Sequence, residues 1–430
     1  MLMTDIIEKK RDKHPLDDKE LEFFVSGVTD KSIPDYQISA LLMAILLNGM
    51  DRRETLTLTT LMAKSGDMLD LSDLSHTADK HSTGGVGDKT TLAVAPIAAA
   101  LGCTVAKMSG RGLGFTGGTV DKLESITGYK IALDTAEFKK IAKEHGMCVT
   151  GQSGNFAPAD KRLYAIRDVT ATVNSIPLIA SSIMSKKLAA GAQTIVLDVK
   201  FGSGAFMKTA EDAEVLAREM VEIGKGAGRK TAAVITDMDV PLGYAVGNAL
   251  EVKEAVRILK GEGEKNLTSL CILLAAKMYQ ISFDKTEEES IAAARRAITD
   301  GSAFKILCAA VKAQGGDEKL LTGEHKFPAA AQTELTAEKD GYITAMNSET
   351  VGKAAVMMGA GREWLGDSID YSAGIILSKK YGDYVQKGER LATLYGAPER
   401  LQNARERLAN AYSIGESKPP EKPIVYKVID

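Results

Sequence analysis

Two glycine-rich segments carry the residues best suited to chemistry. The first is Lys80-His81-Ser82-Thr83-Gly84-Gly85-Val86-Gly87-Asp88, a cation, an imidazole and two hydroxyls directly before three glycines. Glycines let backbone N–H groups turn towards a ligand, and successive N–H groups form an anion-binding concavity. Lys80, Ser82 and Thr83 add donors for phosphate oxygens, and His81 could stabilise charge or donate a proton beside them. A solvated surface turn is the alternative for one such cluster taken alone.

A second cluster of the same kind favours the phosphate interpretation. It runs from Lys107 to Thr119 and contains Ser109 and five glycines, after an apolar run over residues 103–106. A glycine-rich loop at the end of a strand in an α/β domain is a usual place for anions and substrates. Neither cluster fits the ATPase phosphate-loop pattern or the dinucleotide fingerprint, although residues 112–117 match the glycine spacing of the latter. Together they indicate a small phosphate substrate or a phosphorylated sugar.

A third polar group lies between residues 158 and 190. Arg167 is on one predicted helix, and Ser182 and Lys186 are four residues apart on the next, so these two share a face. Arginine and lysine with a neighbouring hydroxyl can bind the carbonyl oxygens and ring nitrogen of a planar polar ligand. A solvated basic helix face is the alternative.

Length and composition narrow the class of protein. A chain of 430 residues predicts two or three domains, and its net charge of −3 gives no basic field for nucleic acid. No apolar run is long enough to span a bilayer, and the first residues lack the features of a signal peptide. The four cysteines are scattered without a C-x-x-C motif, which is typical of a reduced cytoplasmic protein.

Hydrophobic periodicity divides the chain into three parts. Helix-start signals at Asp17, Pro34 and Asp51 predict a small all-helical domain over residues 1–66. Strands then alternate with helices, which predicts an α/β fold with a mainly parallel central sheet. The expected strands are 103–108, 194–199 and 231–236, and the expected helices are 91–101, 120–126, 135–144, 158–174, 177–190 and 210–225.

The last hundred residues differ from the rest. Short strand candidates at 341–343 and 373–377 and a glycine-punctuated segment at 382–391 resemble half of a biotinyl/lipoyl-type module, without a lysine placed for modification. We expect a structural, half barrel-sandwich-like α+β subdomain. The predicted all-helical domain consists of residues 1–66, joined in space by helices of about 158–192. The predicted α/β phosphate-binding domain consists of residues 67–157 and 193–326, and the α+β subdomain of residues 327–430.

With these motifs together, the chain resembles the pyrimidine-nucleoside phosphorylases, the family that includes thymidine phosphorylase. The resemblance covers nearly the whole chain. It rests on the two glycine-rich clusters and on five further segments: 116–125, 151–155, 159–161, 164–170 and 181–187.

The resemblance implies reversible phosphorolysis of a pyrimidine nucleoside to free base and pentose 1-phosphate. Phosphate would attack C1 without a protein nucleophile, and a cleft between the helical and α/β domains would close over the substrates. The implied catalytic residues, which stabilise the leaving base, are His81, Arg167 and Lys186. The implied substrate-binding residues are Arg167, Ser182, Lys186 and Lys107. The implied phosphate ligands are Lys80, His81, Ser82, Thr91, Lys107, Met108, Ser109 and Thr119.

Three positions bear on specificity and cofactors. Lys107 resembles members that accept uridine as well as thymidine, so uridine, thymidine and deoxyuridine are the expected substrates, whereas strict thymidine enzymes carry methionine there. Phe115 stands where members often have histidine.

Some members bind potassium, which implies a site at Gly87, Lys89, Leu242, Ala245 and Glu254. Lys89 replaces the usual threonine, and its side chain cannot be a ligand. No organic cofactor is implied, and the family pairs as a homodimer through its helical domain.

Three alternatives stand beside this interpretation. A phosphoribosyltransferase of the anthranilate type shares the fold but predicts a Mg²⁺ site and a diphosphate loop, and the Lys80-His81-Ser82 run speaks against it. A strict thymidine phosphorylase is the second alternative. The third is a non-catalytic nucleoside-binding protein, which would tolerate the loss of Lys80 or Arg167.

Overall fold

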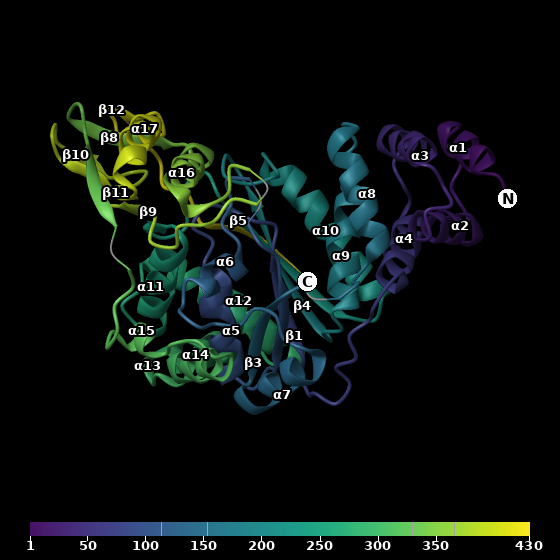
Figure 1. The fold of residues 1–430 in the computed structure, drawn as a ribbon, viewed down its shortest axis with the longest axis horizontal. Coiled ribbons are helices and arrows are strands. Elements are labelled where there is room, and N and C mark those ends of the chain that lie inside the picture. The colour runs from purple at the N-terminus through teal and green to yellow at the C-terminus, as the bar shows by residue number, and fades with distance from the viewer. Residues whose placement is uncertain (113, 153, 329, 365) are drawn as a thin grey trace.

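The chain folds into three parts that follow one another across the molecule (Figure 1). The structure is a computed structural model, and it describes residues 1–112, 114–152, 154–328, 330–364 and 366–430. A helical part lies at one end, a large α/β part in the centre and an α+β part at the other end. Among the described residues, no helix is both long and apolar enough to cross a membrane.

The helical part combines segments that are far apart in the sequence. Asp17 and Asp51 each form a capping box with the glutamate three residues later, which confirms the two predicted helix starts. Leu163, Ile166 and Leu178 pack into the same core as the N-terminal helices, so α8 and α9 stand beside them (Figure 1). These helices are α1 (Met3–Arg11), α2 (Asp18–Thr29), α3 (Asp35–Asn48), α4 (Arg52–Lys64), α8 (Pro158–Val169) and α9 (Ile176–Ala189).

The central sheet is mainly parallel, as predicted. Its strand order is β1-β4-β5-β13, with the first three strands parallel and β13 antiparallel to β5 at the edge. A parallel pair, β2-β3, adjoins β1 through a bridge between Thr77 and Thr104. The bounds are β1 (Ala78–Ser82), β2 (Val105–Ser109), β3 (Met147–Gly151), β4 (Thr194–Phe201), β5 (Lys230–Asp237) and β13 (Val425–Ile429).

Strand β1 was not expected from the sequence. Residues 80–82, which we interpreted as part of a glycine-rich loop, are the second half of this strand. Its sequence, Ala-Asp-Lys-His-Ser, has no apolar alternation after the first residue, so only pairing with β4 makes it a strand. One helix also differs from its prediction: the helix expected over 158–174 ends at Val169, and the chain turns before α9 begins.

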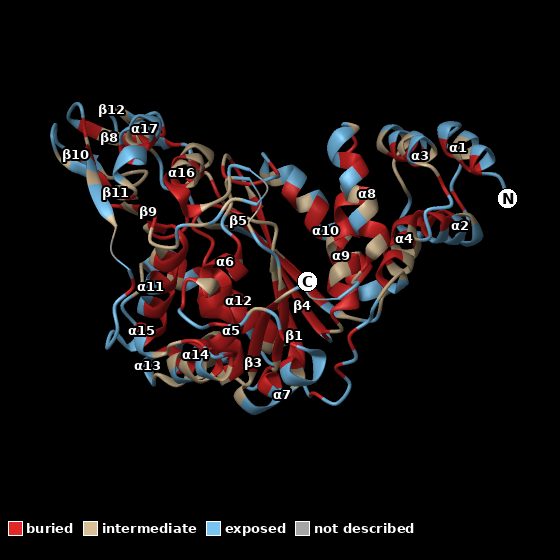
Figure 2. Ribbon diagram, in the orientation of Figure 1, coloured by how far each residue is buried: buried red, intermediate tan, exposed pale blue. Residues whose placement is uncertain are grey.

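Helices cover both faces of the central sheet, and the buried residues of β4 alternate between them. Ile195 and Leu197 pack with α9 and α10, whereas Val196 packs in the larger core with α5 and α12. Figure 2 shows the strands and α5 as the buried centre of the molecule. The remaining helices of this part are α5 (Thr90–Ala100), α6 (Thr119–Glu124), α7 (Thr135–His145), α10 (Ala210–Gly226), α11 (Asn248–Leu259), α12 (Lys265–Phe283), α13 (Glu287–Thr299), α14 (Ser302–Ala313) and α15 (Lys319–Thr322).

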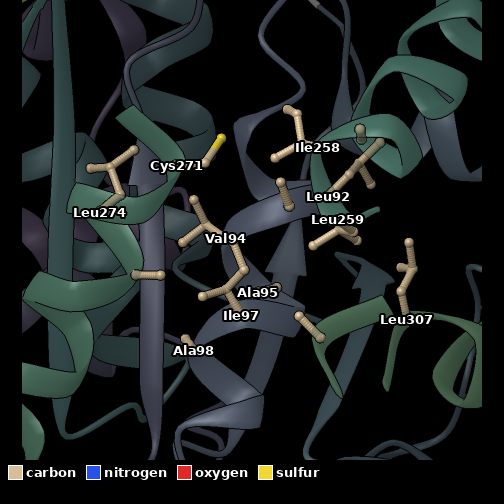
Figure 3. Packing of buried hydrophobic residues seen from close by; sticks show 14 of the residues in the cluster. Leu92, Val94, Ala95, Ile97, Ala98, Ile258, Leu259, Cys271, Leu274 and Leu307 are labelled. Atoms are coloured by element: carbon tan, nitrogen blue, oxygen red, sulfur yellow. The ribbon is translucent and has the colours of Figure 1, made fainter. Parts of the chain in front are cut away.

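Helix α5 is held on all sides. Its first ten residues are all buried, and Leu92, Val94 and Ile97 pack against Ile258 of α11 and Leu274 of α12 (Figure 3). A helix without a solvent-exposed face needs no amphipathic pattern, and packing fixes its position instead. The first turn of α5, which carries Thr90 and Thr91, therefore has a fixed place at the end of β1.

The C-terminal part is α+β, as predicted, and it is joined to the centre by strand pairing. β6 (Ala245–Val246), which precedes α11, pairs with β9 of this part. Its own apolar core also takes in Val86 and the ring of Phe115. The elements are β7 (Ala331–Thr336), β8 (Gly341–Met346), α16 (Ser348–Ala355), a π-helical turn (Val356–Ala360), β9 (Gly374–Leu377), β10 (Tyr384–Val385), β11 (Arg390–Gly396), α17 (Pro398–Ala409) and β12 (Tyr412–Gly415).

Candidate active site

Strand β1 sends its polar side chains to two different partners. Successive side chains of a strand point to opposite faces. Lys80 contacts Thr90 of α5 on one face, and Asp79 contacts Lys187 of α9 on the other. The end of β1 therefore lies between the helix start proposed for phosphate and the helix proposed for the base.

Lys80 belongs to a buried, charge-balanced group on the α5 face. Its ammonium lies 2.9 Å from the carboxylate of Asp198 and donates to the Thr90 hydroxyl at 2.5 Å. Lys200 lies 2.9 Å from the same carboxylate, and Asp88 completes two cations and two anions. Burial lowers the pKa of Lys80, but Asp198 and Asp88 outweigh it and raise that pKa, so the ammonium is charged at neutral pH. One of its three N–H groups has no hydrogen bond to the described residues and is available to an anion.

The hydroxyls of Ser82 and Thr90 are linked to this ammonium through Asp88. Ser82 donates to Asp88 at 2.5 Å and accepts from the backbone N–H of Gly84 at 3.2 Å. Asp88 also accepts from Thr90, which fixes the start of α5 beside Lys80. Thr91 follows in the same turn and is buried. These contacts bring the first set of predicted phosphate ligands together.

The second glycine-rich cluster follows β2. Lys107, Met108 and Ser109 are the last three residues of β2, and Thr119 is the first residue of α6. Met108 is buried in an apolar cluster, so its side chain does not face a ligand. The connection between β2 and α6 is described at residues 110–112 and 114–118, while Leu113 lies outside the described residues.

Asp121 holds this connection in place. Its carboxylate accepts from the backbone N–H of Gly112 at 2.7 Å and lies within 3.0 Å of Arg111 and Arg362. The ring of Phe115 packs against the C-terminal core and contacts Gly352. The aromatic residue that replaces histidine is thus part of an apolar contact between two parts of the molecule.

Lys107 and Lys187 share one carboxylate on the α9 face. Their ammonium groups lie 2.9 and 2.8 Å from Asp79, and Lys107 also donates to the carbonyl of Lys80 at 2.6 Å. Burial raises the pKa of Asp79, but the two ammonium groups outweigh burial and hold it below its usual value. Burial, together with the neighbouring Lys187, lowers the pKa of Lys107 to about 8, although Asp79 opposes this shift. The group carries one excess positive charge at neutral pH.

His81 is neutral in this setting. Burial lowers its pKa well below the usual value, and the ammonium groups of Lys187 and Lys107 lower it further. A neutral imidazole keeps one N–H donor and one acceptor nitrogen.

The helical part supplies the third predicted group. Arg167 is 2% exposed and donates to the carbonyls of Thr172, Val173 and Leu178 at 3.2, 2.7 and 3.0 Å. It thereby fixes the turn between α8 and α9. Burial lowers its pKa, yet a guanidinium stays charged in proteins and keeps two of its five N–H donors for other partners.

Ser182 and Lys186 lie on the helix that this turn positions. Ser182 is buried, and Lys186 is partly exposed with its ammonium 2.9 Å from Asp160 of α8. The next residue, Lys187, contacts Asp79 and so ties α9 to β1, whereas Lys186 itself contacts α8.

The residues implied for potassium do not fit that ion. The ammonium of Lys89 donates to the carbonyls of Leu242 and Ala245 at 2.7 Å each and to Glu254 at 2.6 Å. The carbonyl of Gly87 accepts from the backbone N–H of Lys89. A second cation here would lie close to this ammonium, and two like charges 4 Å apart repel by about 4 kcal/mol near a protein surface, more when buried.

Several polar residues of the site escaped the sequence interpretation. The sequence predicts no role for Asp79, Asp198 or Lys200. Asp198 and Lys200 are nevertheless charged residues in a mostly apolar strand. Such residues signal a buried ion pair, because an unpaired charge in that position costs too much. Lys187 lies in the segment 181–187 that supports the family resemblance, but its partner Asp79 is 108 residues away in the chain.

Three family models match most of the chain. Residues 74–304 match the family described as "Glycosyl transferase family, a/b domain", residues 4–66 its "helical bundle domain", and residues 342–415 the "Pyrimidine nucleoside phosphorylase C-terminal domain". The pyrimidine-nucleoside phosphorylases of Staphylococcus epidermidis (strain ATCC 12228 / FDA PCI 1200) and Geobacillus stearothermophilus are each 50% identical over 432 residues, covering 100% of both chains. That of Staphylococcus aureus (strain USA300) is 52% identical over 419 residues, covering 97% of both.

A solved structure shows the same fold at a greater distance. The anthranilate phosphoribosyltransferase of Thermus thermophilus superposes with a TM-score of 0.59 at 20% identity, over 72% of this chain and 98% of its own. That likeness concerns the fold alone and gives no argument for the anthranilate-type reaction. From its three matched domains and its full-length relatives, the chain belongs to the pyrimidine-nucleoside phosphorylase family of glycosyl-transferring enzymes.

Proposed function

We propose that the protein catalyses the reversible phosphorolysis of uridine, thymidine and deoxyuridine to the free base and ribose or deoxyribose 1-phosphate. The proposal rests on the observation that side chains on the two faces of β1 contact two different helices. Lys80 and Ser82 lie with the start of α5, and Asp79 ties the other face to α9, next to Lys186. The names and full-length identity of the relatives support the reaction class.

Phosphate is the co-substrate and the nucleophile. We assign it to the free N–H of Lys80, the hydroxyls of Ser82, Thr91, Ser109 and Thr119, and backbone groups beside His81 and Met108. Lys107 supports this site indirectly, because its ammonium donates a hydrogen bond to the backbone carbonyl of Lys80. Phosphate forms a bond to C1 of the sugar as the glycosidic bond to the base breaks.

Negative charge develops on the leaving base, and the side chains of His81, Arg167 and Lys186 stabilise it. Arg167 and Lys186 offer N–H donors to the base oxygens and nitrogen, and Ser182 is on α9 one turn before Lys186. His81 is neutral in the free protein and donates a hydrogen bond. Phosphate dianion bound beside it raises its pKa and favours transfer of a proton to the base. Such preorganised donors are worth a factor of about 10² to 10³ each.

Closure of the helical part over the α/β part would bring the two substrate sets together. Where the chain crosses between these parts, two backbone hydrogen bonds hold it: Asp67 to Asn155 and Leu69 to Ala189. Gly191 adopts φ +83° there, and an added Cβ would lie 2.2 Å from the carbonyl of Leu69. A compact crossing of this kind suits a hinge, which excludes water from the reaction.

The first test is phosphate-dependent release of uracil from uridine and of thymine from thymidine, followed by absorbance, for wild type and Lys107→Met. We expect wild type to cleave both nucleosides and the variant to lose uridine activity selectively. Cleavage of thymidine alone would identify a strict thymidine phosphorylase. No phosphate-dependent release from either nucleoside would overturn the proposal.

We also propose that the protein is a homodimer through its helical part. Tyr36, Met43 and Leu47 lie on one face of α3, and the first and last are 75% and 74% exposed. Light scattering coupled to size-exclusion chromatography should give a dimer for wild type and for Val215→Asp on α10, and a monomer for Leu47→Asp. A monomeric wild type would contradict the proposal.

A further inference from the structure

We propose that the ammonium group of Lys89 is a built-in monovalent cation that fixes the phosphate-binding end of α5 and makes this enzyme independent of potassium. The inference concerns the joint between the β1–α5 loop and the C-terminal part, and it goes beyond the proposed reaction. Lys89 is a positioning residue here, because oxygens of the protein itself accept all three N–H groups of its ammonium.

The geometry around Lys89 is that of a filled cation site. Its side chain is completely buried, and its three N–H donors match three acceptors: two carbonyls, of Leu242 and Ala245, and the carboxylate of Glu254. Every donor of the ammonium is used, and each of these acceptors is paired. A lysine ammonium carries the same charge as a potassium ion and is of similar size, so one can replace the other in a ring of oxygens.

Glu254 organises the ring as well as neutralising it. Its two carboxylate oxygens accept from the backbone N–H groups of Tyr244 and Ala245, at 2.7 and 2.8 Å. This orients the 242–245 segment so that its carbonyls face the ammonium. Burial raises the pKa of Glu254, but the Lys89 ammonium outweighs burial and lowers it, so the carboxylate stays charged.

The site lies where the start of α5, the segment before α11 and the C-terminal part meet. Lys89 directly precedes the first turn of α5, with Asp88 and Thr90 in the Lys80 group on its other side. Ala245 begins β6, which pairs with β9 of the C-terminal part. The backbone N–H of Leu242 donates to Val86 in the glycine-rich loop. The charge of Lys89 therefore ties the phosphate-binding loop to the segment that carries the C-terminal part.

Lys89→Thr separates this role from ordinary packing. Threonine removes the ammonium, leaves a space lined by the same carbonyls and carboxylate, and adds a hydroxyl that can ligate an ion. Lys89→Met fills the space with an apolar chain and leaves no room for an ion. The matched control is Lys285→Thr, at an exposed lysine whose side chain makes no hydrogen bond or salt bridge among the described residues.

The experiment measures Tm and phosphorolysis kinetics in KCl, NaCl and choline chloride series at constant ionic strength. For wild type and Lys285→Thr we expect the same Tm, kcat and KM in all three salts. For Lys89→Thr in choline we expect a lower Tm and a KM for phosphate raised about tenfold, with a smaller change in the KM for nucleoside. KCl should restore both values, and no salt should restore Lys89→Met.

Three results would overturn the inference. One is a wild-type enzyme that KCl activates several-fold over choline chloride. Another is a Lys89→Thr variant with wild-type Tm and kinetics in every salt. The third is a Lys89→Thr variant whose Tm and KM for phosphate KCl does not restore. The Tm measurements need no substrate and are therefore independent of the proposed reaction, and the wild-type salt series is independent of any folding defect in Lys89→Thr.

Discussion

The ammonium of Lys107 lies 2.9 Å from the carboxylate of Asp79, in a buried pair that ties β2 to β1 one residue before Lys80. The same ammonium donates to the carbonyl of Lys80. We propose that Lys107 influences substrate choice through the backbone that carries Lys80 and His81. A methionine at position 107 leaves that backbone without this support.

Lys107→Met should be tolerated for folding at pH 7, with a change in unfolding free energy within about 1 kcal/mol, because Asp79 keeps Lys187 as its partner and the excess buried charge is removed. In wild type the pKa of Lys107 falls to about 8, below its unfolded value of about 10.4, so the unfolded chain binds more protons between these pH values. Wild-type stability should rise relative to the variant over this window, by at most about 1.4 kcal/mol per pH unit. Urea denaturation at pH 7, 8, 9 and 10 measures the difference, and a large loss at pH 7 with a flat difference would contradict it.

Arg167→Lys should weaken both stability and nucleoside binding. One ammonium cannot reproduce the fork that holds three carbonyls of the α8–α9 turn, so about 1–3 kcal/mol of stability is lost. The KM for nucleoside should rise about tenfold, equivalent to about 1.4 kcal/mol.

Arg162→Lys is the matched control for this change. Arg162 is also on α8 and also donates to two carbonyls, of Val28 and Ile33, but on the face that meets the N-terminal helices. It should lose stability without a change in KM. Equal changes in KM for the two variants would show that Arg167 acts only on the fold.

His81 should titrate well below an ordinary histidine in the free protein and move upwards with phosphate. Folding keeps the ring neutral while the unfolded chain takes up a proton below about pH 6.5, so stability is lost as the pH falls below that value. His81→Gln should remove this part of the acid sensitivity. Proton NMR of the five histidine rings, with His81 assigned from the His81→Gln spectrum, gives the pKa directly. A His81 pKa near 6.5 that phosphate leaves unchanged would contradict the mechanism proposed for the base.

Phe115 should matter for stability rather than for sugar or base contacts. Its ring is partly buried against the C-terminal core. Phe115→Ala should cost about 1–3 kcal/mol of unfolding free energy, while Phe115→Leu keeps most of it. The ratio of uridine to thymidine activity should stay the same in both variants. A change in this ratio in Phe115→Leu would place the ring at the substrate.

The sequence revealed the chemistry of the site through local patterns. Glycine-rich clusters after short apolar runs indicate anion-binding loops because they depend on neighbouring residues only. Capping signals at Asp17 and Asp51 mark helix starts for the same reason, and the apolar run of β4 shows a buried strand. These patterns and the family resemblance determined the fold class. The domain limits and the roles of single site residues stay predictions.

Tertiary structure alone decided the partners of the charged side chains. Asp79 meets Lys187 from 108 positions away, and Lys89 meets Glu254 from 165. No local pattern encodes such pairs, because they depend on how β1, α9 and α11 pack. The sequence shows only that position 89 carries a lysine. The fold shows that its ammonium is buried and bonded to oxygens of the protein. Because an unpaired buried charge is costly, this ammonium needs such partners.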